Sequence, residues 1–197
     1  MGLHITGRFI LASASPRRVE LLKRLGLVFE VMPSGADESF LNGETPEKHV
    51  LRLSRTKAEC ISCLNPEAWV LGADTIVIIK GEVLGKPRTP EEARQMLGKL
   101  SGQEHLVYTG FTIRRREDNR LASRAMISSV LFKDLSEQEM SWYVNTAEPY
   151  DKAGGYAVQG LGAFFIREIR GSYTNVMGLP LCEVVDALKD LGALQFI

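Results

Sequence analysis

Serine and arginine residues cluster in the sequence ASASPRR, and these residue types suit a phosphate group. Ser13 and Ser15 offer hydroxyl groups, while Arg17 and Arg18 offer two guanidinium groups. The N–H groups at a helix N-terminus favour an anion, and the guanidinium fork matches phosphate oxygens. The stretch therefore predicts a phosphate site at the start of a helix that begins at Pro16. A serine-capped strand, turn and helix without a ligand would give the same pattern.

An aspartate, Asp74, interrupts the apolar run WVLGADTIVII at residues 69–79. A buried carboxylate is costly unless it is hydrogen-bonded, binds a cation or holds a proton. This cost favours a functional aspartate over one that caps a local turn. Lys57 falls on the apolar face of a predicted helix, so it either extends past the core edge or points into a cleft. We also expect Lys86, which follows the next turn, to be an interior lysine.

Carboxylates combined with lysine, arginine and serine are the groups that a magnesium–nucleotide site needs. Mg²⁺ takes one or two carboxylates and keeps water and phosphate oxygens as its other ligands. The spacing alone leaves the ligands open among Asp37, Glu38, Asp74 and Asp151. The three cysteines and three histidines are scattered, so a Cys/His metal site is not expected.

Several function classes are excluded by the sequence. It contains no GxxxxGK[ST] loop, no kinase signature and no GxSxG motif, which argues against P-loop enzymes, protein kinases and serine hydrolases. Its 24 Lys and Arg residues balance 24 Asp and Glu residues, so no overall field favours nucleic acid or a membrane surface. The basic run at residues 114–116 has no interleaved aromatics and is interpreted as a solvated hairpin tip.

Strands alternating with helices must position these groups, which predicts an α/β fold. Expected strands are at residues 9–13, 27–33, 69–79, 83–87, 105–116, 120–132 and 163–169. Expected helices begin at residues 16, 45, 89, 136 and 180, where serine, threonine or proline start signals occur. The glycine-rich segment at residues 148–162 is irregular, and long irregular segments in compact domains are usually functional. Residues 171–175 are expected to form a loop.

The composition is that of one soluble domain spanning residues 1–197. Apolar residues make up 45% and charged residues 24% of the chain. The odd cysteine count, with Cys60 and Cys63 one helical turn apart, predicts reduced thiols in a cytoplasmic protein. No signal peptide is seen, and the longest apolar runs are far short of the roughly 18 residues of a membrane span.

An ordered set of short motifs across nearly the whole chain resembles the Maf family of nucleoside triphosphate pyrophosphatases. Each motif is weak alone, but their order is highly specific. The motifs are LASASPRR, ADES, RTKA around Lys57, GADTIV, LGKP, SGQEHLVYTG, DKAGGYAVQG and NVMGLP. The resemblance implies a central twisted mixed β-sheet flanked by helices, with two lobes and an active-site cleft, related to the inosine triphosphate pyrophosphatase fold.

The resemblance also implies an activity and residue roles. Hydrolysis between the α and β phosphates would release a nucleoside monophosphate and pyrophosphate, with Mg²⁺, Mn²⁺ or another divalent cation as cofactor. Asp74 would accept a proton from water, and Glu38 would bind the metal together with Asp74. The triphosphate would be bound by Ser13, Arg18, Lys57 and Lys86. A homodimer is implied by the resemblance alone.

Three positions point to the branch of the family that acts on dTTP, UTP and modified pyrimidine nucleotides such as 5-methyl-UTP and pseudo-UTP. That branch has Arg, Thr and Gln where this chain has Arg17, Thr75 and Gln159. A second branch, which acts on 7-methyl-GTP, has SPWR, SDQ and SEG where this chain has SPRR, ADT and VQG. Two alternatives stay open, namely that second branch and a non-catalytic nucleotide-binding regulator of septum formation.

Overall fold

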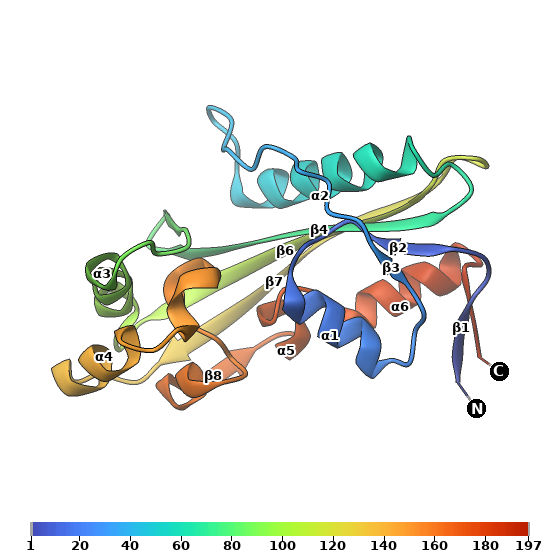
Figure 1. Cartoon of the computed structure of the whole chain (residues 1–197). Coiled ribbons are helices and arrows are strands. Elements are labelled where there is room, and N and C mark those ends of the chain that lie inside the picture. Colours follow the sequence, from blue (N-terminus) through green and yellow to red (C-terminus); the bar gives the residue numbers. More distant parts are fainter. Residues whose placement is uncertain (1, 197) are drawn as a thin grey trace. The chain divides into compact units, whose positions relative to one another are not determined.

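Figure 1 shows the computed structural model of the chain, which describes residues 2–196. The chain divides into two compact units. The first unit runs to Asp74, resumes over Thr109–Met126 and again from Gly178, and the second comprises Thr75–Tyr108 and Ile127–Met177. No helix within the described residues is long and apolar enough to cross a membrane.

Seven strands form one mixed sheet, in which β2 is parallel to both β3 and β4. β5 is antiparallel to β4, and β8 is antiparallel to β7. The order is β3-β2-β4-β6-β7-β8, with β5 paired to β4 outside this path. The strands are β2 (Phe9–Leu11), β3 (Glu30–Val31), β4 (Trp69–Ile79), β5 (Glu82–Leu84), β6 (Glu104–Arg115), β7 (Arg120–Phe132) and β8 (Ile166–Arg170). The central mixed sheet of the sequence analysis is confirmed.

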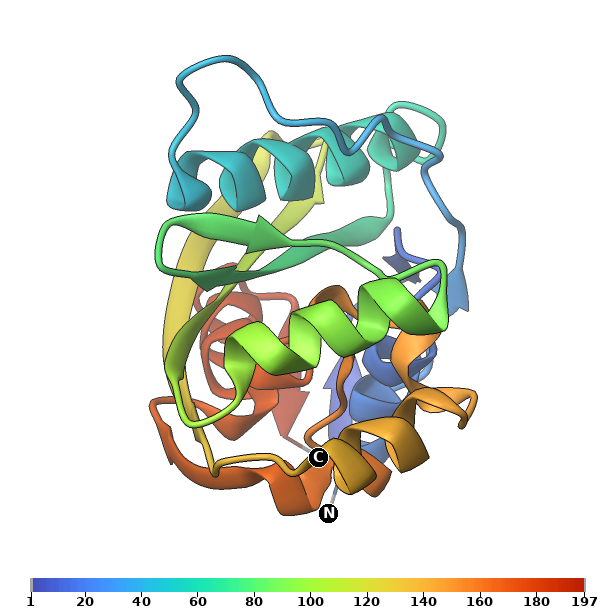
Figure 2. The ribbon, with the colours of Figure 1, turned by 90° about the vertical axis from the view of Figure 1, so that its left-hand side faces the viewer.

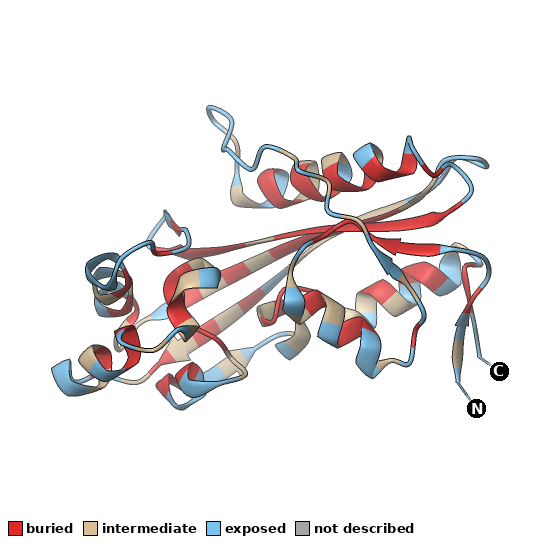
Figure 3. Ribbon diagram, viewed as in Figure 1, coloured by how far each residue is buried: buried red, intermediate tan, exposed pale blue. Residues whose placement is uncertain are grey.

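Three helices flank the sheet in the first unit, α2 on one face and α1 with α6 on the other (Figure 1). They are α1 (Pro16–Arg24), α2 (Pro46–Ser62) and α6 (Leu181–Asp190). Both α1 and α2 begin with proline, whose missing N–H has no helical partner at that position. The Thr45 side chain caps α2 by accepting from the Lys48 N–H. Figure 3 shows the buried side of α2 facing the buried strand β4.

Glycines let α2 lie directly on the sheet. A Cβ atom added to Gly72 would lie 2.3 Å from the Ser54 carbonyl oxygen, and one added to Gly110 would lie 2.2 Å from the Val50 carbonyl oxygen. Any larger residue at either position would therefore collide with the helix backbone. This close approach brings the α2 side chains to the level of the β4 strand.

The second unit packs its own helices around a separate apolar core, and Figure 2 views it with α3 in green and α4 in orange. Its helices are α3 (Pro90–Leu100), α4 (Glu137–Val144) and α5 (Tyr173–Val176), with short 3₁₀ turns η1 (Glu148–Asp151), η2 (Ala153–Gly155) and η3 (Leu161–Phe165). The Ser136–Glu139 capping box at the start of α4 is present. Its core includes Leu97, Phe132 and Phe165.

Some expected elements differ from the observed ones. The strand expected at residues 27–33 contains only Glu30–Val31, and Val28 beside it is 89% exposed. Residues 163–165 belong to η3, so β8 begins at Ile166, and the loop expected at residues 171–175 contains the short helix α5. The strand β4 continues through Asp74 without interruption. A two-stranded antiparallel sheet of β1 (Leu3–Ile5) and β9 (Leu194–Phe196) was not predicted.

Candidate active site

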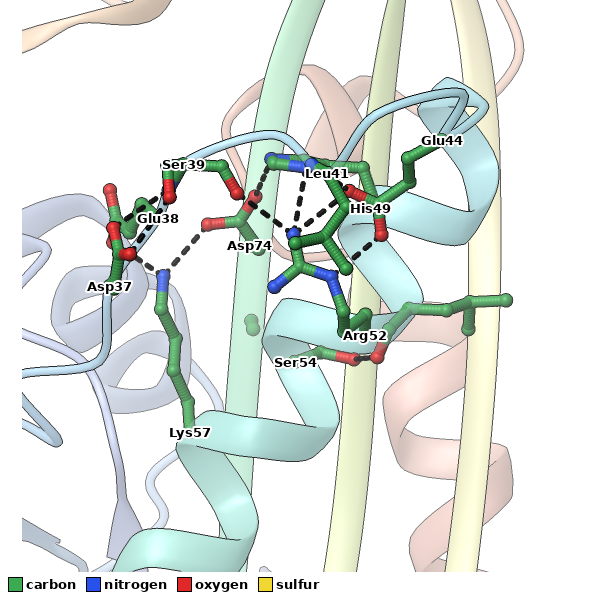
Figure 4. A network of polar contacts seen from close by, with 12 residues as sticks. Asp37, Glu38, Ser39, Leu41, Glu44, His49, Arg52, Ser54, Lys57 and Asp74 are labelled. Atoms are coloured by element: carbon green, nitrogen blue, oxygen red, sulfur yellow. Dashed lines mark hydrogen bonds and ion pairs between the residues drawn. The ribbon is translucent and has the colours of Figure 1, made fainter.

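A buried lysine joins two carboxylates in the first unit (Figure 4). Lys57 Nζ lies 2.7 Å from Asp74 Oδ1 and 2.6 Å from Glu38 Oε1. The side chains of Lys57 and Asp74 are only 7% and 8% exposed, whereas that of Glu38 is 56% exposed. Lys57 is directed at these carboxylates, so it does not extend past the core edge. The ion pair with Asp74 is therefore shielded from water on the lysine and aspartate side.

The strand and helix place these groups by their regular spacing. Side chains two residues apart in a strand share a face, so Asp74 lies on the same face of β4 as Gly72, against α2. Thr75, the next residue, lies on the opposite face by the same rule and is half-buried. Glu38 comes from the loop that precedes α2. The aspartate inside an apolar strand is thus compensated by an ion pair, as its burial requires.

Three further polar residues beside Asp74 were not predicted as site residues. His49 Nδ1 lies 2.9 Å from Glu44 Oε2, and its Nε2 faces Asp74 Oδ2 at 4.0 Å. Arg52 binds both oxygens of Glu44, with Nε at 2.6 Å from Oε1 and one terminal nitrogen at 2.8 Å from Oε2. The Phe40 ring stacks on the His49 ring, with centroids 3.5 Å apart and planes 6° from parallel.

Charge pairing determines the protonation state of the Glu44 carboxyl. The Arg52 guanidinium hydrogen-bonded to Glu44 lowers the pKa of that carboxyl to about 2, with His49 and the Leu41 N–H adding to the effect against burial. Glu44 is therefore ionised at neutral pH and acts only as a hydrogen-bond acceptor. The spacing of Glu44, His49 and Arg52 could have signalled this cluster, because the histidine and arginine lie one turn apart on α2 just after the glutamate.

The predicted phosphate loop has an internal hydrogen-bond network. Arg18 is buried and donates to the Gly178 carbonyl at 2.8 Å, to Ser13 Oγ at 2.8 Å and to the Ala73 carbonyl at 2.9 Å. Burial lowers the pKa of Arg18, and the charge of Asp74 opposes that shift. Ser13 Oγ also accepts from the Ser15 N–H, and Ser15, the N-cap residue of α1, makes no side-chain capping hydrogen bond. Arg18 therefore links Ser13 to the strand residue before Asp74.

The other predicted site residues are placed as follows. Arg17 is half-buried in the first turn of α1. Lys86 and Gln159 belong, with Thr75, to the second unit. Lys86 is exposed, so its description as an interior lysine was wrong: it lies two residues after the end of β5, in a segment without regular secondary structure. Gln159 is half-buried, and it directly precedes Gly160.

A carboxylate fixes the loop that follows Gln159. Glu148 Oε1 accepts from the Tyr143 hydroxyl and the Gly162 N–H, both at 2.8 Å, and Oε2 accepts from the Leu161 N–H at 2.8 Å. A Cβ atom at Gly160 would lie 2.3 Å from Glu148 Oε2, so glycine is required there. The segment expected to be irregular is therefore tightly hydrogen-bonded in the second unit.

The carboxylates of Asp74 and Glu38 fit a hard divalent cation whose other ligands are water and phosphate oxygens. Within residues 2–196, no three His, Cys, Asp or Glu side chains gather as a metal-binding group. Lys57 contacts one oxygen of Asp74 and one of Glu38, which leaves carboxylate lone pairs on both residues. Mg²⁺ requires only one or two protein carboxylates when phosphate oxygens complete its shell. Chemically, the cluster can bind phosphate-bound cations and accept a proton at Asp74.

The chain is similar to known proteins over most of its length. A model of the family described as Maf-like protein matches residues 8–191. A dTTP/UTP pyrophosphatase of Syntrophus aciditrophicus (strain SB) is 63% identical over 192 residues, which cover 98% of this chain and 94% of the relative. A dTTP/UTP pyrophosphatase of Geotalea uraniireducens (strain Rf4) is 50% identical over 186 residues, covering 94% of this chain and 96% of the relative.

One solved structure is a weaker match. The structure of a HAM1 protein from Coxiella burnetii aligns with a TM-score of 0.41 and 16% sequence identity, covering 64% of this chain and 73% of that chain. A likeness of this size is too low to decide the fold.

Proposed function

The chain belongs to the Maf family, and from this premise we propose that it is a nucleoside triphosphate pyrophosphatase that hydrolyses dTTP and UTP to the monophosphate and pyrophosphate. The name dTTP/UTP pyrophosphatase is carried by relatives that are 63% and 50% identical over nearly the whole chain. The observation that carries the proposal is the buried Lys57–Asp74 ion pair with Glu38 beside it. The burial of both Lys57 and Asp74 distinguishes this pair from a surface ion pair and supports a functional site.

Asp74 is the proposed proton acceptor. Its Oδ1 is occupied by Lys57, so Oδ2 is the oxygen that takes a proton from water. The water oxygen forms a bond to the α-phosphorus, and the bond from that phosphorus to the oxygen bridging to the β-phosphate breaks. Pyrophosphate leaves with the bonding electron pair, one proton passes to Asp74, and the other stays on the new phosphate oxygen. A positioned general base of this type contributes about 100- to 10,000-fold in rate.

Positive and hydroxyl groups are proposed to bind the triphosphate. Lys57 brings an ammonium group to the Asp74 carboxylate, and Lys86 is exposed enough to reach a ligand. Arg18 adds a buried positive charge and holds Ser13 Oγ, whose proton can be donated to a phosphate oxygen. Charge of this sign neutralises the negative charge that develops on the leaving pyrophosphate.

We propose Asp74 and Glu38 as the residues that would hold a divalent cation, with Mg²⁺ first and Mn²⁺ as a substitute. When bound, the cation would neutralise phosphate charge and polarise the phosphorus–oxygen bonds. Glu38 suits this role because its exposed carboxylate can turn toward a cation delivered with the nucleotide. The two carboxylates are oxygen donors of the hard type that this ion prefers.

Base selection is proposed to depend on Arg17, Thr75 and Gln159. The Gln159 amide can both donate and accept hydrogen bonds, as the edge of uracil or thymine requires. The Glu148 contacts that fix residues 160–162 support a defined position for this amide. We extend the proposal to modified pyrimidine triphosphates such as 5-methyl-UTP and pseudo-UTP, because the recognised edge of the base is the same.

The test is pyrophosphate release with Mg²⁺ from UTP, dTTP, CTP, GTP, 7-methyl-GTP and ITP, run for the wild type and Asp74→Asn. We expect turnover of UTP and dTTP in the wild type and a loss of about 100-fold or more in the variant. Nucleotide affinity should be retained, because asparagine keeps the shape of the side chain. Preference for 7-methyl-GTP would support the second family branch, and binding without any turnover would support a nucleotide-binding regulator.

The proposal also covers the cellular compartment and the oligomeric state of the protein. We propose a cytoplasmic protein, which the three free and exposed cysteines support because thiols stay reduced there. A homodimer without a nucleic-acid partner is proposed from the family resemblance and from the zero net charge. Light scattering after size-exclusion chromatography, with and without added DNA, tests both statements.

A further inference from the structure

The buried His49 lies beside Asp74 (Figure 4), and the proposed mechanism gives it no role. Its side chain is 2% exposed, and its Nε2 lies 4.0 Å from Asp74 Oδ2. That oxygen is the one Lys57 does not contact. We propose that His49 Nε2 is a second hydrogen-bond acceptor for the attacking water, and that Glu44 holds the ring in the form that makes it one. The inference rests on the proposed function.

The hydrogen bond from His49 to Glu44 decides the tautomer. Glu44 is ionised because Arg52 binds both of its oxygens, so the 2.9 Å contact to His49 Nδ1 requires a proton on that nitrogen. Arg52 also lies 3.4 Å from His49 Nδ1, but that separation is long beside the contact to Glu44. In the proposed form, with a proton on Nδ1 and none on Nε2, Nε2 carries a lone pair and faces Asp74.

The ring cannot easily turn away from this orientation. Glu44 fixes its Nδ1 edge, and Phe40 covers one of its faces at a centroid distance of 3.5 Å. His49 itself belongs to the rigid helix α2, which the glycines of the sheet hold against β4. The Nε2 atom therefore keeps its position relative to Asp74.

Two acceptors separated by 4.0 Å are too far apart for a direct hydrogen bond and suit one bridging water. A water that donates one hydrogen to Asp74 Oδ2 and the other to His49 Nε2 has both hydrogens directed, so its lone pairs point away from the two residues. Such orientation of a nucleophile lowers the entropic cost of reaching the reactive geometry. On attack one proton passes to Asp74, and the proton toward His49 stays on the oxygen that joins the α-phosphorus.

Two substitutions of His49 test the roles of the two ring nitrogens separately. His49→Asn keeps a donor at the position of Nδ1 for Glu44 but has no atom at the position of Nε2. His49→Gln places an amide oxygen at the position of Nε2. We expect kcat for UTP to fall about 10- to 100-fold in His49→Asn, with KM changed less than about threefold, and to recover most of this loss in His49→Gln. The exposed His4→Asn is the matched control and should leave kcat unchanged.

The tautomer is measured without turnover. Nitrogen NMR of the ¹⁵N-histidine-labelled protein should show Nδ1 protonated and Nε2 unprotonated for His49, with the signal assigned by its absence from His49→Asn. Glu44→Gln should abolish this preference. An imidazolium, or a ring protonated at Nε2, would overturn the inference, as would equal losses of kcat in the two position-49 variants.

The kinetic and NMR measurements distinguish a failure of the proposed function from a failure of the proposed role of His49. If the wild type releases no pyrophosphate from any triphosphate, the proposed function fails. The NMR measurement still decides whether Nε2 is an acceptor toward Asp74. If the wild type is active but His49→Asn retains kcat within about twofold, the proposed function stands and the role of His49 is refuted.

Discussion

Each unit buries a histidine, and the surroundings of the two rings are opposite. His49 and His105 are both about 1% exposed. His49 lies between ionised groups, with Glu44 on Nδ1 and Asp74 beyond Nε2. His105 lies among aromatic rings, with Nε2 at 2.7 Å from the Tyr156 hydroxyl and Phe132 edge-on at 5.1 Å. Its Nδ1 has no hydrogen-bond partner among the described residues.

The difference teaches that burial alone does not identify a functional histidine. Burial lowers the pKa of His105 to about 4, so that ring is neutral in the folded protein and serves as part of the core. His49 instead belongs to a charged cluster that converges on Asp74. The candidate site differs from the core because its buried side chains have partners of opposite charge, supplied by several elements.

The largest effect is expected from removing the positive charge of the site cluster. Lys57→Met leaves the nearly buried Asp74 carboxylate without its ion-pair partner, because Lys57 is its partner at 2.7 Å. Loss of one member of a buried pair costs about 3–5 kcal/mol in the free energy of unfolding. Urea denaturation measures this cost.

The double variant Lys57→Met with Asp74→Asn is the control for this charge argument. It removes the stranded carboxylate, so most of the lost stability should return. A single variant within about 1 kcal/mol of the wild type would show that the cluster is not held together by charge.

The second effect is a pH dependence caused by the core histidine, His105. The pKa of His105 is lowered from 6.5 to about 4 in the folded state, so the unfolded chain binds more protons between these values. The stability contributed by the neutral ring is therefore fully present above pH 6.5 and is lost as pH falls toward 4. The loss reaches about 3 kcal/mol in the free energy of unfolding.

His105→Gln tests this pH dependence. The glutamine amide can still pair with the Tyr156 hydroxyl but does not titrate. Denaturation of both proteins from pH 7 to pH 4 should give a steeper decline for the wild type. Parallel curves would mean that the pKa of His105 is not lowered in the folded protein.

The smallest effect is expected from a change in helix packing, which is compared between the two units. Gly110→Ala would place a Cβ atom 2.2 Å from the Val50 carbonyl oxygen and push α2 away from the sheet. Overpacking of this kind costs about 1–3 kcal/mol. Because α2 carries Lys57 and His49, kcat should fall as well. Thermal unfolding and UTP turnover measure the two consequences.

Gly98→Ala is the matched control in α3 of the second unit. Nothing lies within 4 Å of a Cβ atom at Gly98, so alanine should stabilise the helix by about 0.5–1 kcal/mol. Equal effects of the two alanines would contradict the close approach of α2.

The sequence predicted the elements that have strong local signals. The β-branched run at Trp69–Ile79 gave the exact bounds of β4, and the Thr-Pro pairs gave the starts of α2 and α3. The three residues of β1 and of β9 carry no local signal, because they pair only with each other across almost the whole chain. The one-turn helix α5 was missed although its N-cap Ser172, which accepts from the Asn175 N–H, is a local start signal.

The candidate site was predicted in part. Asp74 and Lys57 stood out because a charge inside an apolar pattern is costly, and Glu38 because of its family motif. His49 was missed because histidines were judged by mutual spacing, as metal ligands would be, whereas its partners are carboxylates. The orientation of Lys57 could not be predicted, since it depends on how closely α2 packs against Gly72 and Gly110.

The hydrogen bonds of Arg18 have a consequence for how the protein is made. Its three acceptors lie 5, 55 and 160 residues away along the chain. Contacts of such long sequence separation form slowly, because loop closure must be completed before they contribute. A chain emerging from the ribosome lacks the Gly178 acceptor until residue 178 has been synthesised. The surroundings of Ser13 and Ala73 therefore reach their final arrangement only after that point, and a nascent chain should not acquire the activity before then.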